Sequence, residues 1–199
     1  MKNFALKGKA TCRVVYPQTL FEKKQVKGSE GAPKYNALFL IPKDDTAKVD
    51  QVKAEFAEAF KELQNSGFKG KAISAINPKN NCFVDGDAWA DEQDGKEQFR
   101  GYYVLKCASK NFRPLVVDTQ KRVILNGVPM DNVPVENISD ETLEDGDIVH
   151  INVSFWTYCN PTAAGIGCNV HAVMRVAAGE RIGGMSKNAD DYFGAESYE

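Results

Sequence analysis

The sequence predicts a small mixed-β barrel or sandwich that carries one long helix. Three observations lead to this fold class: most apolar segments are short and alternate with polar residues, Gly and Pro separate them, and one segment, 46–64, has helical periodicity. The chain has 199 residues, of which 43% are hydrophobic and 26% charged. This composition is close to the average for globular domains and is sufficient for a core of its own.

Segment 46–64 is the one convincing helix. Its apolar residues recur every three or four positions and form one stripe, made of Val49, Val52, Phe56, Phe60 and Leu63. Asp44 and Asp45 precede the segment, where carboxylates cap and stabilise a helix N-terminus, and Ser66-Gly67 ends it. We expect the apolar stripe to face the core.

The remaining elements are short strands separated by turns. Alternation and β-branched residues predict strands at 5–16, 35–41, 99–107, 148–158 and 168–177, with extended pieces at 115–117 and 123–125. The segment 35–41 is apolar throughout, which predicts a strand buried on both faces. Residues 22–34 are rich in Lys and Gly and should form a loop, and residues 85–98 form an acidic, turn-rich insertion.

Alternation along four strands predicts a second face that carries no acidic residue. Opposite the core residues stand Lys7, Lys9, Thr11 and Arg13; Arg100, Tyr102, Val104 and Lys106; His150, Asn152, Ser154, Trp156 and Tyr158; and Asn169, His171, Val173 and Arg175. Cations and aromatic rings on one β-surface suit a single-stranded nucleic acid, because Lys and Arg bind phosphates and flat rings stack on unpaired bases. An equal alternative is that the helix or the acidic insertion covers this face and makes its aromatics a second core.

The predicted DNA-binding residues follow from this face and from the Lys-rich loop. They are Lys7, Lys9, Arg13, Lys34, Arg100, Tyr102, Lys106, Trp156, Tyr158, His171 and Arg175. Charge is distributed unevenly along the chain, because residues 188–199 hold four of the 27 acidic residues and no Lys or Arg. Such an asymmetry is typical of a protein with a polyanionic ligand or an interaction tail.

Enzymatic and metal-binding motifs are absent from the sequence. It contains no Walker A lysine motif, GxSxG or HExxH, and no GxGxxG follows a strand. Asp85, Asp87 and Asp91 are closely spaced, but this loop fails the EF-hand template at Ala90 and Lys96. Alternation places Cys168 and His171 on opposite faces of one strand, so a zinc site with Cys159 is not expected. We therefore expect no metal and no cofactor.

Several segments resemble the single-stranded-DNA-binding proteins of tailed bacteriophages. The resemblance lies in KGKATCRVVYPQTLF (7–21), YNALFLIPK (35–43), FRGYYVLKCASKNFRPLVVD (99–118), SFWTYCN (154–160) and GIGCNVHAVMRVAAGERIGG (165–184). It implies an OB-fold core, a five-stranded barrel with added strands and loops, over 1–187. It also implies sequence-tolerant strand binding and a flexible acidic tail, 188–199, that recruits replication or recombination partners. The candidate partner-binding residues of the tail are Asp190, Asp191, Tyr192, Phe193, Glu196, Tyr198 and Glu199.

The functional expectation is a non-enzymatic protein that coats and protects single-stranded DNA in phage replication or recombination. Its tail would contact a phage or host polymerase, recombinase or helicase, and its oligomeric state stays open between monomer and dimer. The odd number of five Cys, without a CxxC, and the absence of an apolar signal segment favour a cytosolic protein, and the resemblance implies the cytoplasm of the bacterial host. Two alternatives are a phage interaction or structural component, whose aromatic face docks a protein, and a metal-dependent nuclease using Asp85, Asp87 and Asp91.

Overall fold

The strands form a continuous path that closes into a barrel. The computed structural model describes residues 3–7, 12–25, 31–66, 81–159 and 164–182. Its strands are β1 (Phe4–Leu6), β2 (Cys12–Val15), β3 (Tyr35–Pro42), β4 (Phe83–Asp85), β5 (Tyr102–Ser109), β6 (Leu115–Val117), β7 (Ile148–Cys159) and β8 (Ala164–Ala177). The helices are α1 (Thr46–Ser66) and α2 (Gly86–Glu92), with short 3-10 turns η1 (Pro17–Leu20), η4 (Glu97–Phe99) and η5 (Val135–Asn137).

The barrel has OB-fold topology. Neighbouring strands follow the order β4-β5-β3-β2-β7-β8-β6, and β1 pairs with the same strand as β2, β7. Cys82 closes the barrel between β8 and β5, because its N–H donates to the Ile166 carbonyl (2.9 Å) and its carbonyl accepts from the Lys106 N–H (2.7 Å). The five barrel strands are thus the interrupted β1/β2, β3, β5, β7 and β8, and the predicted OB fold is confirmed.

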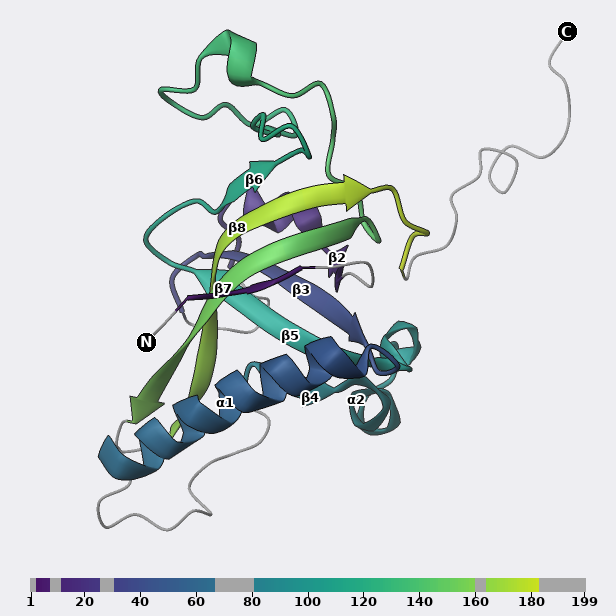
Figure 1. Cartoon of the computed structure of the whole chain (residues 1–199), viewed down its shortest axis with the longest axis vertical. Helices are drawn as coiled ribbons and strands as arrows, with labels where there is room; N and C mark the ends of the chain where they lie inside the picture. The colour runs from purple at the N-terminus through teal and green to yellow at the C-terminus, as the bar shows by residue number, and fades with distance from the viewer. Residues whose placement is uncertain (1–2, 8–11, 26–30, 67–80, 160–163, 183–199) are drawn as a thin grey trace, which may run out of the picture.

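Helix α1 packs against one end of the barrel (Figure 1). Its buried residues Val49, Val52, Ala59 and Leu63 join the main core. The Phe56 ring meets the Phe155 ring of β7 edge-on, with centroids 5.6 Å apart. The predicted helix is therefore present and extends to Ser66, and its apolar stripe faces the core as expected. Among the described residues, no helix is long and apolar enough to cross a membrane.

A second, smaller core lies outside the barrel. The sequence leaves its existence undecided, as one of two equal alternatives for the second face of the strands. Its buried residues are Val15, Leu40, Phe99, Val104 and Ile182. The acidic insertion covers this cluster, since it forms α2 and η4 rather than turns alone, and Trp89 of α2 stacks on Phe99 with ring centroids 5.1 Å apart. Strand β3 is therefore buried on both faces, as predicted. Phe99 belongs to this outer cluster, whereas Leu105 and Cys107 belong to the main core.

A β-bulge in β8 changes the direction of its side chains. Val153 pairs with Val170, but Asn152 pairs with Ala172, so His171 is an extra residue in the ladder. Val170 and Val173 are consequently both buried, although strict alternation would place them on opposite faces. The predicted alternation holds before the bulge and is inverted after it.

An arm between β6 and β7 extends from the barrel on the side away from α1 (Figure 1). The buried carboxylate of Asp118 holds its base, because it accepts hydrogen bonds from Ser139 Oγ (2.7 Å) and from Arg122 Nε (2.8 Å). Burial favours a higher pKa for Asp118, but these hydrogen bonds outweigh it and lower the pKa to about 2. The carboxylate is therefore a charged anchor for the arm at neutral pH.

Candidate nucleic-acid interface

Two aromatic rings lie on the outer face of β7 and extend over the neighbouring strand β8. The register pairs Trp156 with Gly167 and Tyr158 with Gly165, and the ring centroids are 5.4 Å apart. A Cβ atom on Gly165 would lie 2.6 Å from Tyr158 Oη, and one on Gly167 would overlap the indole. The rings can therefore lie against β8 only because both positions are glycine. Trp156 keeps 38% of its surface exposed.

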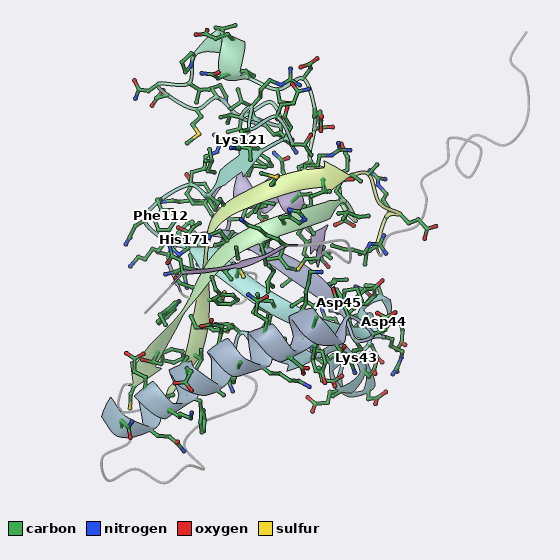
Figure 2. All side chains as sticks on the ribbon, viewed as in Figure 1. Lys43, Asp44, Asp45, Phe112, Lys121 and His171 are labelled. Atoms are coloured by element: carbon green, nitrogen blue, oxygen red, sulfur yellow. The ribbon has the colours of Figure 1, made fainter. Side chains whose placement is uncertain are left out.

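A second ring pair lies farther along the same face. The His171 ring accepts or donates a hydrogen bond at Nε2 with Ser154 Oγ (2.8 Å), and Phe112 stacks on it with centroids 5.5 Å apart and an interplanar angle of 11°. Figure 2 shows Phe112 and His171 side by side next to β7 and β8. Phe112 retains 42% exposure. We call Trp156, Tyr158, Phe112 and His171 the aromatic platform.

The sequence predicted three members of the platform and missed Phe112. Trp156, Tyr158 and His171 come together on one face because β7 and β8 pair directly. Phe112 lies in the turn after β5, where strand alternation gives no information about direction. The sequence does contain a pattern that predicts the role of the glycines. A hairpin that pairs WTY (156–158) with GIG (165–167) places each aromatic ring opposite a glycine.

Arg175 lies on the core side of β8, which corrects its predicted place on the outer face. It follows the bulge and pairs with Val149, a core residue. Its guanidinium forms ion pairs with Asp147 and Glu141, both at 2.7 Å, and its pKa is raised chiefly by the hydrogen bond to Asp147. The Asp147 side chain is only 2% exposed. These contacts make Arg175 a structural cation at the end of the barrel.

Arg13 and Tyr102 are packed beside the second core rather than on an open surface. Arg13 donates from Nη1 to Tyr102 Oη (3.3 Å), from Nε to the Gly146 carbonyl (3.2 Å), and from Nη2 to the Glu180 carbonyl. Tyr102 packs against the cluster of Val104 and Phe99. For β5 the alternative interpretation, a face covered by the acidic insertion, is the correct one, because Phe99 and Trp89 pack with Val104 and Tyr102.

Arg100 and Lys106 also differ from the predicted arrangement. Arg100 follows η4, outside the strand, and forms ion pairs with Glu97 (2.6 Å) and Asp91 (2.8 Å), which raise its pKa. Lys106 does point outward from β5, but its ammonium lies 5.7 Å from the Trp89 ring centroid. Burial lowers the pKa of Lys106. Lys106 and Trp89 therefore lie next to each other on the outside of the barrel.

Several predicted lysines lie at exposed positions around the barrel. Lys7 is exposed after β1, and Lys34 is exposed before β3, where its backbone pairs with that of Lys24. The Lys23 ammonium lies 5.4 Å from the Tyr35 ring centroid, in the same β2–β3 connection. Lys9 and the seven tail residues fall outside the described residues.

The three carboxylates of the acidic triplet, Asp85, Asp87 and Asp91, are paired with cations. Asp85 and Asp87 both bind the Lys43 ammonium, at 2.6 and 2.7 Å, and Asp91 binds Arg100. Asp85 also caps α2 through the Asp87 N–H. Among the described residues, no group of three His, Cys, Asp or Glu side chains is arranged to hold a metal ion.

The thiols of Cys107 and Cys168 lie on the core side of their strands. Cys107 and Cys168 lie inside the barrel with sulfur atoms 3.3 Å apart, while His171 faces outward. Burial raises the pKa of Cys12 to about 12. The expectation that Cys168 and His171 do not converge is thus confirmed.

An OB-fold barrel with aromatic rings displayed on its outer face belongs to the class of oligonucleotide-binding β-barrels. In such barrels, rings that stack on bases and cations that follow the backbone bind single strands. The platform of this chain has the rings, and the exposed lysines supply cations.

Comparison with known proteins identifies the family. A sequence model described as the ssDNA-binding protein of Enterobacter phage Enc34 matches residues 7–199, and the chain belongs to this family. It is 31% identical over 195 residues to a protein named p50 from Acyrthosiphon pisum secondary endosymbiont phage 1, and the match covers 94% of each chain. The predicted membership in a phage single-stranded-DNA-binding family is confirmed.

Solved structures show the same fold. The Enc34 single-stranded DNA-binding protein in complex with ssDNA aligns with a TM-score of 0.63 and 20% identity, over 91% of this chain and 89% of that one. A second structure of the single-stranded DNA-binding protein from bacteriophage Enc34 aligns with a TM-score of 0.63 and 19% identity, over 96% of this chain and 89% of the other.

Proposed function

We propose that this protein binds single-stranded DNA through the aromatic platform, with little sequence preference, in phage DNA replication or recombination. The observation that carries the proposal is the pair of Trp156 and Tyr158 on their glycine partners, with Phe112 and His171 on the same face. A ring held against a strand is ordered before DNA arrives, so less side-chain entropy is lost on binding. Stacking on such rings stabilises the complex by about 1–3 kcal/mol per base and tolerates any base.

Exposed lysines supply the electrostatic part of binding. Lys7 is exposed after β1, and Lys23, Lys24 and Lys34 are exposed in the connection between β2 and β3. Each phosphate that they neutralise should contribute about −0.7 to the slope of log K against log salt. The interface therefore combines stacking, which is insensitive to salt, with phosphate contacts, which are not.

The protein acts by binding alone, without catalysis or a cofactor, and works in the cytoplasm of the infected bacterium. Residues 1–187 form the DNA-binding domain. The acidic tail, 188–199, binds a polymerase, recombinase or helicase of the phage or host. The family match covers residues 7–199 and therefore includes the tail.

Titration with matched oligonucleotides tests the proposal. Labelled single-stranded DNA, RNA and duplex of one length are titrated against the wild type and against Trp156→Ala, Tyr158→Ala and Phe112→Ala. We expect preferential binding of single-stranded DNA and a loss of about 1–3 kcal/mol for each variant whose ring stacks a base. Val135→Ala, which truncates an 82% exposed side chain on the arm, is the control.

Three results would contradict the proposal. Unchanged affinity in all three ring variants would show that the platform is not the DNA site. Absence of binding to any oligonucleotide, together with capture of a protein partner, would favour an interaction component instead. Cleavage of the DNA on incubation with magnesium or manganese would reveal a nuclease, and we expect the DNA to remain intact.

A further inference from the structure

A groove of about 370 Å³ opens beside β4, between α1 and α2. Phe56, Phe83, Ala88 and Trp89 give it apolar and aromatic walls, and Asn81 and Lys106 are among its polar groups. A concave site of roughly 300–1,000 Å³, mainly apolar with few polar groups, is typical of a small-ligand pocket. The volume and the aromatic lining fit a flat, heterocyclic ligand.

Trp89 is fixed within this groove. Its ring stacks on Phe99 at an interplanar angle of 18°, and its indole nitrogen donates to Gln93 Oε1 (3.0 Å). The Lys96 ammonium lies 4.9 Å from the ring centroid. A ring held by three neighbours is a rigid stacking surface, because little side-chain freedom is left to lose when a ligand binds.

The groove adjoins the aromatic platform across the seam of the barrel. The backbone N–H of Lys106 donates to the Cys82 carbonyl, and the N–H of Cys82 donates to the carbonyl of Ile166, which lies between the two glycines under the platform rings. Neighbouring strands are about 4.8 Å apart, so two strand steps separate the backbone of Lys106 from that of Ile166. A single strand that leaves the platform across β8 therefore meets Lys106 and then the groove.

The charges around the groove determine which part of a nucleotide it accepts. Lys106 stands on the barrel side, whereas Glu92 belongs to α2; Asp85, at the N-terminus of α2, is already paired with the Lys43 ammonium. The Glu92 carboxylate disfavours a phosphate inside the groove, and the Lys106 ammonium favours one at the barrel side. A base inside and a phosphate near Lys106 satisfy both conditions.

We infer that this groove is a nucleobase pocket, which takes one unpaired base of the same DNA strand that the platform binds. The inference rests on the proposed function and extends the interface beyond the platform. In the complex, the base lies against Trp89 and its phosphate faces Lys106. The pocket adds one stacked base to the complex and fixes the direction in which the strand crosses the barrel.

Tryptophan fluorescence distinguishes the pocket from the platform, because the chain has two tryptophans, one in each. In Trp156→Phe, emission comes from Trp89 alone, and in Trp89→Phe it comes from Trp156 alone. Titration with oligothymidylate should quench both variants. Quenching of Trp156 with unchanged Trp89 emission would overturn the pocket and leave the proposed function intact. Unchanged emission in both variants would contradict both the nucleobase pocket and the proposed function.

Filling the groove provides an independent test. Ala88 is exposed on α2 and lines the groove, so Ala88→Leu should occupy it without removing a packed side chain. We expect about tenfold weaker binding of oligothymidylate, as for the loss of one stacked base. Ala54→Leu, at an exposed position of α1 outside the groove, is the matched control. Equal affinity of these two variants, with equal melting temperatures, would overturn the pocket.

Discussion

Replacing Gly167 by Ala should weaken DNA binding nearly as much as removing the Trp156 side chain. A Cβ at position 167 would overlap the indole, and its backbone has no left-handed conformation that an alanine would resist. Strand β8 is held here by β7 on one edge and by Cys82 on the other. The ring, which is already 38% exposed, must therefore move away from the strand.

The expected magnitude follows from one stacked base. Loss of about 1–3 kcal/mol corresponds to a dissociation constant that is roughly 5- to 150-fold higher. The melting temperature should change little, because two small effects oppose each other. The displaced ring loses part of its packing, while alanine reduces the entropy of the unfolded chain and stabilises the fold by about 0.4–1 kcal/mol.

Fluorescence anisotropy with a labelled oligonucleotide measures the effect in Gly167→Ala, Trp156→Ala and the double variant. If the glycine acts only through the ring, Gly167→Ala should cost nothing further once the ring is gone. The reasoning is refuted if Gly167→Ala binds like the wild type, or if it weakens binding equally in the Trp156→Ala background.

Four other predictions concern charge. Arg175→Ala should destabilise the fold by about 3–5 kcal/mol, because it leaves the buried Asp147 unpaired, yet leave the salt dependence of DNA binding unchanged; a shallower slope with normal stability would contradict this. Lys34→Ala should reduce the slope of log K against log salt by about 0.7 if it contacts a phosphate; an unchanged slope removes it from the interface. The pKa of Asp118 is lowered to about 2, so its stabilising effect is complete above about pH 4 and lost as the pH falls toward 2. In denaturant unfolding, the free energies of the wild type and of Asp118→Asn should therefore converge toward pH 2. A difference that persists at pH 2 would refute the role of Asp118 as a charged anchor. Deleting 188–199 should tighten DNA binding at about 10 mM salt, where the Debye length is about 30 Å, because the acidic tail then no longer competes with DNA. The deletion should also abolish partner recruitment. Unchanged or weaker DNA binding would exclude competition by the tail.

Periodicity was sufficient for elements whose pattern is uninterrupted. The stripe from Val49 to Leu63 has a helical period over its whole length, and the helix is where the stripe predicts it. The alternation in β7 likewise separates the buried Phe155 from the outward Trp156. In both cases burial repeats at a fixed interval, which is the property that a sequence pattern records.

Features that depend on one inserted residue or on tertiary packing were not predictable in this way. Uninterrupted alternation predicts Arg175 on the outer face of β8. The extra residue His171 inverts the alternation, and Arg175 therefore lies on the core side. The sequence left open whether the acidic insertion covers β5, and the outcome depends on how Trp89 and Phe99 meet the strand from a distance in the chain. Phe112 lies in a turn, whose direction no period specifies.

The bulge in β8 divides this strand into two halves with different tolerance to substitution. Before His171, outward positions such as Gly165 and Gly167 set the shape of the surface that we propose to bind DNA, so changes there should alter affinity while the fold survives. After it, the positions of Val173 and Arg175 face inward, and changes there should reduce expression and stability. Selection for tighter or weaker DNA binding in this family should therefore find its variants in the first half of the strand.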